Sequence, residues 1–304
     1  MTELIERMLR HDRLALSRLL SLAARGSAGP DVAARLPAPS QPARVVAFTG
    51  SGGVGKSSLI GKMIDTARRH EATVAVLACD PQSALSGGAL LGDRFRMGSR
   101  TDDGVFIRSL AAVSGHGAVA DHLELMCRIL EVYGFATIYL ETVGAGQGDI
   151  AVRDLADVVV LLLQPETGDD LQWEKAGVLE VADVIVIHKA DLPNADHVAA
   201  QVRAALELSS ARAVPVVLVS AKTESGLEEL WQVIQAAPLR RSPDAGARRE
   251  LLRLAQDRLT DRFFQMRDDH ELAKLVEAWQ RGECSADQVA DAVLSAVARS
   301  CPEL

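Results

Sequence analysis

The sequence lacks the features that mark several large classes of protein. Its 304 residues include only four cysteines, and none forms a C-x-x-C pair, so neither a disulfide framework nor a thiolate metal site is indicated. No apolar run approaches the length of about 20 residues that crosses a bilayer as a helix. Acidic residues outnumber basic ones, 41 to 33, which argues against nucleic acid as the main partner. We therefore expect neither a membrane nor a nucleic acid among the partners.

The first residues of the chain also lack a targeting pattern. Glu3, Glu6 and Asp12 interrupt the apolar residues there. Such a segment fits neither a secretory signal nor an acid-poor transit peptide. Because the scattered cysteines are also expected to be reduced, we expect a cytoplasmic protein.

A glycine-rich stretch beginning at Gly50 is the strongest motif in the chain. Gly50-Ser51-Gly52-Gly53-Val54-Gly55-Lys56-Ser57 fits the G-x-x-x-x-G-K-[ST] phosphate-binding loop, between an apolar strand pattern and a helical one. Glycines let backbone N–H groups turn inward, and the helix N-terminus adds partial positive charge. Lys56 is expected to reach the outer phosphates of a nucleoside triphosphate, and the Ser57 hydroxyl to bind Mg²⁺. The residues expected to line the phosphates are Gly52, Gly53, Val54, Gly55, Lys56, Ser57 and Ser58.

Strand and helix patterns alternate through the middle of the chain. The strand candidates are mostly continuous Val/Ile/Leu runs, which is typical of strands covered on both faces: 44–49, 73–79, 105–110, 135–140, 158–163, 184–188 and 214–219. Helical patterns lie between most of them, which predicts an α/β fold, a mainly parallel P-loop NTPase sheet flanked by helices. We expect this domain over 41–238, with helical N- and C-terminal extensions over 1–40 and 239–304.

The two extensions have patterns of their own. One amphipathic helix is predicted over 2–24, and the stretch 28–41, rich in Pro, Ala and Ser, is interpreted as a linker. A second linker at 239–243 begins a basic cluster of Arg240, Arg241, Arg248 and Arg249. We expect this cluster on a solvated, partly helical face, and a partner-binding patch is the alternative. Three helices are predicted near 246–265, 268–281 and 286–299, and the residues Ser285 to Gln288 form a capping-box pattern before the last.

Carboxylates at strand ends are the candidate metal ligands. Asp80 and Glu141 follow two predicted strands, and open parallel sheets bind ligands at that edge. Such a carboxylate can hold Mg²⁺ beside the phosphates, and the loop after it can respond to the γ-phosphate. Asp93 is a weaker candidate on spacing. The catalytic residues predicted are Lys56, Glu141 and Gln147, the last orienting the attacking water.

Two short motifs further along the chain indicate guanine. His188-Lys189-Ala190-Asp191 is close to the Asn-Lys-x-Asp motif, in which the Asp carboxylate accepts from guanine N1–H and the exocyclic amine. Ser220-Ala221-Lys222 matches the element whose backbone N–H meets the guanine oxygen. Asn at the first position normally donates to base N7 and tethers the phosphate loop. Since a neutral His offers one N–H, we expect selectivity for GTP to survive.

The chain resembles the methylmalonyl-CoA mutase-associated GTPases, G-protein chaperones of adenosylcobalamin-dependent acyl-CoA mutases. The residues that carry the resemblance are the phosphate loop, Asp80-Pro81-Gln82-Ser83, 88–97, Glu141 to Gln147, 168–172, 175–177 and Ala182-Asp183. The resemblance implies that Asp80, Asp93 and Glu141 are metal-site carboxylates, that 165–183 is an additional switch sensing the mutase, and that the tail forms a homodimer. It also implies GTP/GDP and Mg²⁺ as ligands, with adenosylcobalamin reached only through the partner mutase.

The function predicted is that of a slow GTPase that gates adenosylcobalamin loading and rescue of an acyl-CoA mutase. Switch loops are expected around 80–97, 141–149 and 165–183. One alternative is a nickel or cobalt metallochaperone GTPase, although the seven histidines are dispersed. Another is a P-loop ATPase scaffold, whose loop would carry Lys where this chain has Ser51. An amino-acid kinase would need an acceptor-binding constellation, which is not visible.

Overall fold

The computed structural model describes most of the chain. The described residues are 1–24, 29–81, 102–112, 118–142, 155–165, 182–208, 213–240 and 270–299, with short helical pieces at 255–256, 259–260 and 262–263. The chain divides into two compact units, Met1–Arg241 and Ser242–Leu304. Each unit is described by itself below.

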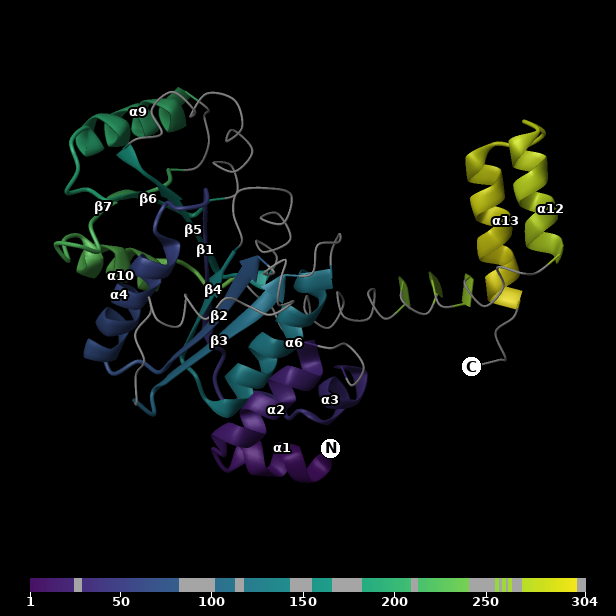
Figure 1. Ribbon diagram of the computed structural model, residues 1–304, viewed down its shortest axis with the longest axis horizontal. Helices are drawn as coiled ribbons and strands as arrows, with labels where there is room; N and C mark the ends of the chain where they lie inside the picture. Colours follow the sequence, from purple (N-terminus) through teal and green to yellow (C-terminus); the bar gives the residue numbers. More distant parts are fainter. Residues whose placement is uncertain are drawn as a thin grey trace. The chain divides into compact units, whose positions relative to one another are not determined.

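A seven-stranded parallel sheet forms the centre of the first unit (Figure 1). Its strands lie in the order β3-β2-β4-β1-β5-β6-β7, and every neighbouring pair is parallel. Their bounds are β1 Arg44–Gly50, β2 Val74–Pro81, β3 Val105–Ala112, β4 Thr137–Glu141, β5 Val158–Leu163, β6 Val184–His188 and β7 Val216–Val219. The predicted α/β fold is thus confirmed, with every predicted strand present and shifted by at most two residues at an end.

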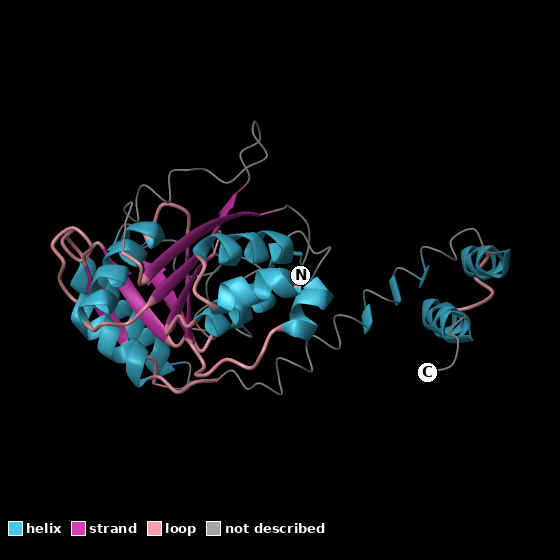
Figure 2. Ribbon diagram, turned by 90° about the horizontal axis from the view of Figure 1, so that it is seen from below, coloured by secondary structure: helices cyan, strands magenta, loops and turns pink. Residues whose placement is uncertain are grey.

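Helices cover both faces of this sheet (Figure 2). Alternation along each strand sorts its side chains: in β1, Val45 and Ala47 pack toward one face, and Val46 and Phe48 toward the other. The helices α4 (Lys56–Arg69) and α10 (Leu227–Ala236) cover the second face. The first face is covered by α2 (Arg13–Ala24), α6 (Ala118–Tyr133) and, over β5 and β6, α9 (Ala195–Leu208).

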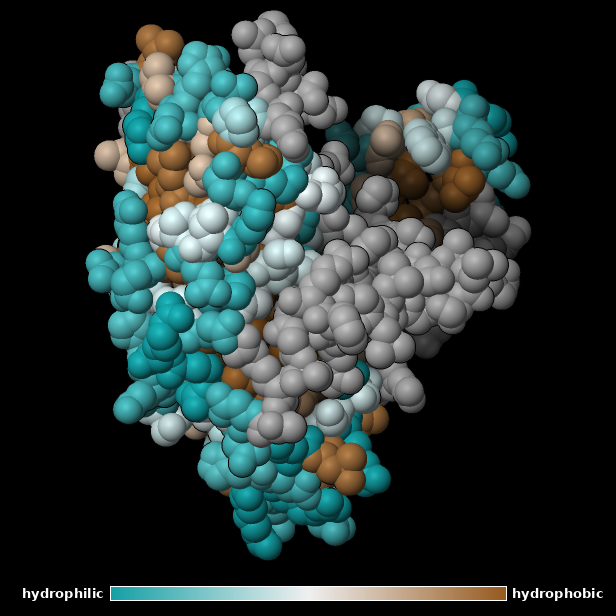
Figure 3. Space-filling view, turned by 60° about the vertical axis from the view of Figure 1, so that its left-hand side comes forward, coloured by the Kyte–Doolittle hydropathy of each residue, from teal (hydrophilic) through white to brown (hydrophobic). Residues whose placement is uncertain are grey.

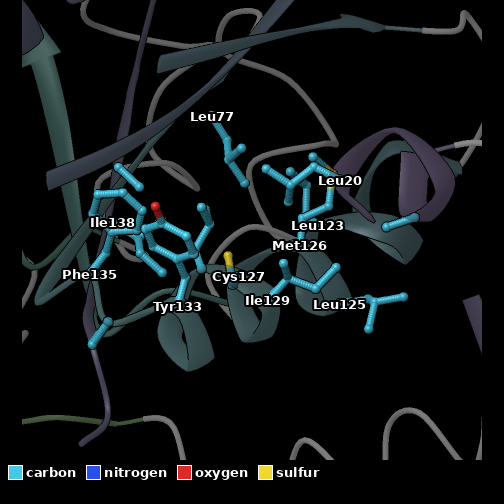
Figure 4. Packing of buried hydrophobic residues seen from close by; sticks show 14 of the residues in the cluster. Leu20, Leu77, Leu123, Leu125, Met126, Cys127, Ile129, Tyr133, Phe135 and Ile138 are labelled. Carbon is cyan, nitrogen blue, oxygen red and sulfur yellow. The ribbon is translucent and has the colours of Figure 1, made fainter. Parts of the chain in front are cut away.

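The core under α6 joins the N-terminal helices to the sheet. Leu20 of α2 lies beside Leu123 and Met126 of α6, and all three belong to one buried cluster with Leu77 and Ile138 of the sheet (Figure 4). Each fully buried side chain of this size contributes about 1.5–3 kcal/mol. The N-terminal helices are therefore part of the first unit's core.

The N-terminal region differs from its prediction in two places. The single helix expected over 2–24 is two helices, α1 (Thr2–Leu9) and α2, because His11 adopts a left-handed φ of 62° and Asp12 caps α2. The Asp12 carboxylate accepts hydrogen bonds from the N–H groups of Leu14 at 2.8 Å and Ala15 at 3.1 Å. The expected linker over 28–41 contains a helix, α3 (Gly29–Arg35).

Near the amino ends of three strands, two aspartates bind Arg240, which lies close to the end of the first unit. Asp157 accepts hydrogen bonds from the N–H groups of Val45 at 2.9 Å and Arg240 at 3.0 Å. Asp183 accepts from the N–H of Val159 at 2.8 Å and pairs with the Arg240 guanidinium, which also donates to the Asp157 carbonyl. Arg240 is therefore half-buried in an ion-pair network, and the expectation of a solvated face for it was wrong.

Among the coloured residues of the face shown in Figure 3, hydrophilic residues predominate and hydrophobic residues lie in separate patches. In the described part of the chain, no helix is both long and apolar enough to span a bilayer.

The second unit contains two helices that pack on each other, α12 (His270–Gln280) and α13 (Ala286–Arg299). The predicted capping box opens α13: the Ser285 hydroxyl accepts from the Gln288 N–H at 3.2 Å, and the Gln288 side chain accepts from the Ser285 N–H at 2.9 Å. The helix predicted near 246–265 lies mostly outside the described residues.

Candidate functional site

Five neighbouring strands bring the predicted motifs to one edge of the sheet. In sheet order, β4 ends at Glu141, β1 at Gly50, β5 just before Gln164, β6 at His188 and β7 just before Ser220. Since all strands are parallel, these positions share the carboxyl edge, where open α/β sheets bind ligands. We call the part of this edge at β4 and β1, which carries the phosphate-loop motif, the phosphate half, and the part at β5, β6 and β7, which carries the two guanine motifs, the base half.

The phosphate loop has the backbone shape that its glycines predict. Gly53 and Gly55 have φ values of 76° and 101°, in the left-handed region that favours glycine. Gly55 is also the N-cap of α4 and makes no side-chain cap. A Cβ added at Gly52 or Gly53 would meet no atom within 4 Å, so the loop has open space above it. A helix N-terminus without a side-chain cap, beside such space, suits a phosphate.

Lys56 lies over this loop. Its ammonium donates to the carbonyl of Gly50 at 2.8 Å and to that of Ser51 at 3.2 Å, and the residue is 8% exposed. A buried ammonium held by loop carbonyls is a point charge placed beside the open space of the loop. Its place beside the loop is the one that the motif predicts for the lysine.

Ser57 and Glu141 form a buried pair at the ends of α4 and β4. The Ser57 hydroxyl donates to Glu141 Oε1 at 2.6 Å, and Glu141 lies opposite Phe48 in the register of β1 and β4. A hydroxyl and a carboxylate supply the oxygen ligands that Mg²⁺ prefers. The two residues therefore fit the metal predicted for them.

The remaining predicted metal and water ligands are only partly described. Asp80 lies on β2 two residues beyond Ala78, which pairs with Glu141, so its backbone is near the metal candidates; its side chain is outside the described set. Asp93 and Gln147 lie outside the described residues.

The base half centres on Asp191. Its carboxylate accepts from the Ser220 hydroxyl at 2.6 Å, and Lys222 lies 3.6 Å from its other oxygen. The hydrogen bond from Ser220 is the main reason that the pKa of Asp191 is held below its ordinary value. The carboxylate is thus kept ionised as an acceptor.

The turn after β7 is braced to the rest of the base half. The Ala190 N–H donates to the Val219 carbonyl at 3.1 Å, and the Ser220 hydroxyl accepts from the Thr223 N–H at 3.2 Å. Ala221 and Lys222 lie within this turn. The structure therefore brings the His188–Asp191 and Ser220–Lys222 motifs together.

Lys189 has a left-handed φ of 58°, which a lysine rarely adopts. Its ammonium donates to the Gln164 side chain at 2.8 Å, so it joins the base half to the end of β5. Gln164 belongs to none of the predicted motifs. Its position directly after a predicted strand was the available signal.

His188 connects the two halves. The residue is 3% exposed, and its Nδ1 lies 2.8 Å from the Val54 carbonyl of the phosphate loop. A Cβ at Gly55 would lie 2.5 Å from His188 Cε1, so the ring needs glycine at that position. Burial is the main cause that lowers the pKa of His188.

These features define a class. An all-parallel sheet whose first strand leads into a phosphate loop, with a serine of the following helix bonded to a glutamate at the end of the adjacent strand, is typical of a P-loop nucleotide hydrolase. Within that class, the chain belongs to the family of methylmalonyl Co-A mutase-associated GTPases, MeaB, whose family model matches residues 21–278. The protein is a GTPase.

Similar proteins agree with this assignment. A Pyrococcus abyssi protein whose name calls it a GTPase is 41% identical over 241 residues, 77% of this chain and 74% of that one. The fused isobutyryl-CoA mutase of Nocardia farcinica is 42% identical over 148 residues, 48% of this chain and 14% of that protein. A solved structure titled an LAO/AO transport system kinase covers 97% of both chains with a TM-score of 0.68 at 20% identity, and it shows the same fold.

Proposed function

We propose that GTP lies along the carboxyl edge, with its phosphates on the loop after β1 and its base against Asp191. The open space above Gly52 and Gly53 and the uncapped start of α4 support the phosphate position. The ionised Asp191 carboxylate supports the base position, because adenine has no donor pair to match guanine N1–H and its amine.

We propose that Ser57 and Glu141 hold Mg²⁺, with Asp80 and Asp93 as further carboxylates of the metal site. A bound Mg²⁺ would neutralise charge on the β- and γ-phosphates. Lys56, already beside the loop, and the N–H groups of α4 stabilise the negative charge that develops as water attacks the γ-phosphate. Gln147 is proposed to orient that water.

We further propose that this GTPase gates adenosylcobalamin loading and rescue of a partner acyl-CoA mutase. The observation that carries the proposal is the membership of the chain in the mutase-associated family. The relative in which a matching segment is fused to isobutyryl-CoA mutase supports an acyl-CoA mutase as the partner class. The cofactor reaches this chain only through that partner.

Two proposed switch segments, 141–149 and 165–183, begin at described residues of the site. The first follows the metal candidate Glu141, so loss of the γ-phosphate would act on it directly. The second begins beside Gln164, whose side chain accepts from Lys189 of the base half. Segment 80–97, the third proposed switch, begins at the end of β2.

GTP turnover with and without a purified adenosylcobalamin-dependent acyl-CoA mutase tests this function. We expect slow turnover alone and faster turnover with the mutase. We also expect transfer of adenosylcobalamin to the apo-mutase to differ between GTP and GDP. The Lys56→Ala variant is the control for contaminating hydrolases. Unchanged turnover and transfer with each mutase class would contradict the chaperone role and leave the GTPase activity intact.

We also propose that residues 239–304 form a homodimer contact. Val276 and Trp279 on α12 and Leu294 on α13 are large apolar side chains that are 37%, 51% and 51% exposed. Exposed apolar side chains on one pair of helices are suited to burial against a second copy of the chain. Light scattering of the full chain and of Trp279→Glu should report a dimer and a monomer, respectively; a monomeric wild type would contradict the proposal.

A further inference from the structure

His188 occupies the position where the guanine motif has asparagine. An asparagine amide carries two N–H groups, so it can donate to a phosphate-loop carbonyl and to guanine N7 together. A neutral imidazole carries one N–H. Whether this chain can make both contacts therefore depends on where that single N–H lies.

The structure assigns the N–H of His188 to the phosphate loop. Nδ1 lies 2.8 Å from the Val54 carbonyl, and a carbonyl oxygen only accepts, so Nδ1 carries the proton. Nε2 is then left with a lone pair and can only accept. This nitrogen is buried and has no hydrogen-bond partner within the described part of the chain.

The ring is held in this position. It lies against the backbone of Gly55, where even a methyl group would overlap Cε1, and the residue is 3% exposed. Burial disfavours the charged imidazolium, so a second N–H at Nε2 is suppressed at neutral pH and above.

Guanine N7 is also an acceptor, and two acceptors form no hydrogen bond with each other. We propose that His188 keeps the tether to the phosphate loop and gives up the contact to N7, so that this GTPase recognises guanine through the edge facing Asp191 alone. This inference rests on the proposed assignment of the His188–Asp191 motif to the base. It makes His188 a specificity-determining residue that removes one position of the purine from recognition.

Binding of GTP, 7-deaza-GTP and ATP to the full chain at pH 8 tests the proposal, because 7-deaza-GTP replaces N7 with a C–H group. Since no hydrogen bond is lost, wild type should bind GTP and 7-deaza-GTP within about twofold of each other. The variant His188→Asn restores a second N–H and should prefer GTP over 7-deaza-GTP by roughly fivefold, the effect of one neutral hydrogen bond.

A control variant separates the tether from base recognition. His188→Ala removes the bond to Val54 and should weaken GTP and 7-deaza-GTP equally, leaving their ratio near that of wild type. The wild-type ratio needs no variant, so the test survives if a variant fails to fold.

The possible outcomes separate the role of His188 from the proposed base site. A wild type that binds 7-deaza-GTP fivefold or more weakly than GTP, while still rejecting ATP, would overturn the role of His188 and leave the proposed guanine site standing. A wild type that binds ATP as tightly as GTP would overturn the proposed base site, and this inference with it.

Discussion

The two edges of the sheet both place carboxylates at strand ends, yet their partners differ. At the amino edge, Asp157 and Asp183 accept from backbone N–H groups and from Arg240. At the carboxyl edge, Glu141 and Asp191 accept from hydroxyls, and the Lys222 ammonium 3.6 Å from Asp191 belongs to an exposed side chain. A backbone N–H or a guanidinium is committed to its partner by the fold.

A hydroxyl can rotate, and it donates and accepts, so it can be shared with a ligand. The hydroxyls of Ser57 and Ser220 leave the carboxylates beside them able to bind a cation or a base edge. Position at a strand end and burial do not by themselves separate a supporting carboxylate from a functional one. We propose that the chemical type of the partner does, and substitutions at the two edges test this contrast.

The largest effect is expected at the phosphate half. Lys56→Ala removes the buried ammonium beside the loop and should lower kcat for GTP hydrolysis by about 100- to 1,000-fold, as loss of one charge-stabilising donor does elsewhere. Phosphate release measures it. Lys62→Ala is the matched control on the same helix: its ion pair with Glu224 is exposed, so activity should stay near wild type. A similar loss in both variants would mean that α4 itself was disturbed.

Substitution in the base half is expected to change which nucleotide the protein prefers. Asp191→Asn exchanges an acceptor for an N–H donor, so GTP should bind roughly 100-fold more weakly, since hydrogen bonds to a charged group are lost. Xanthosine triphosphate, which has an acceptor at C2, should gain affinity. Asp196→Asn, in the first turn of α9, removes an exposed carboxylate nearby and should change neither nucleotide. A variant that lost affinity for GTP without gaining affinity for xanthosine triphosphate would place Asp191 outside the base site.

The amino edge should affect stability and leave nucleotide preference unchanged. Arg240→Ala removes the guanidinium from the buried Asp183 carboxylate and from the Asp157 carbonyl, and because Arg240 is itself partly solvated we expect a loss of about 2 kcal/mol in the free energy of unfolding. Urea unfolding measures it. A change in the GTP-to-ATP affinity ratio of the folded variant would show that the two edges are coupled and would weaken the contrast.

The smallest effect is expected at the junction of α1 and α2, distant in sequence from both edges. The hydrogen bond from Arg7 is the main reason that the pKa of Asp12 is lowered. A depressed pKa stabilises the fold above the ordinary pKa of aspartate, and the gain is lost as pH falls through the folded value. The Asp12→Asn variant should therefore melt a few degrees lower than wild type at pH 7, whereas near pH 2.5 the two proteins should have the same melting temperature. Thermal denaturation measures both differences. An equal difference at both pH values would rule out the charge as the cause.

The strands and the phosphate loop could be predicted because their signals are local. Continuous β-branched runs specify strands buried on both faces, and the loop sequence specifies its own backbone shape. The N-terminal break was missed because apolar periodicity continues across it, while the deciding event is one left-handed residue, His11, followed by the cap at Asp12.

The contacts that were missed join residues far apart in sequence. Arg240 lies 83 residues from Asp157 and 57 from Asp183. The sequence therefore held no sign of these acidic partners, and the environment of Arg240 was predicted from its basic neighbours alone. Gln164 belongs to no motif, and only the strand order places it beside Lys189. His188 was identified as a departure from the motif, but the atom that carries its proton follows from the distance to Val54.

The contacts of Arg240 also determine where the chain can be truncated. A shortened chain that stopped at residue 238, where the strand and helix pattern ends, would discard the guanidinium from Asp183 and the backbone N–H from Asp157. Ending the chain at Arg241 instead would retain both. For anyone preparing the first unit alone, those three residues decide whether the buried Asp183 carboxylate keeps its guanidinium partner and Asp157 its backbone N–H donor.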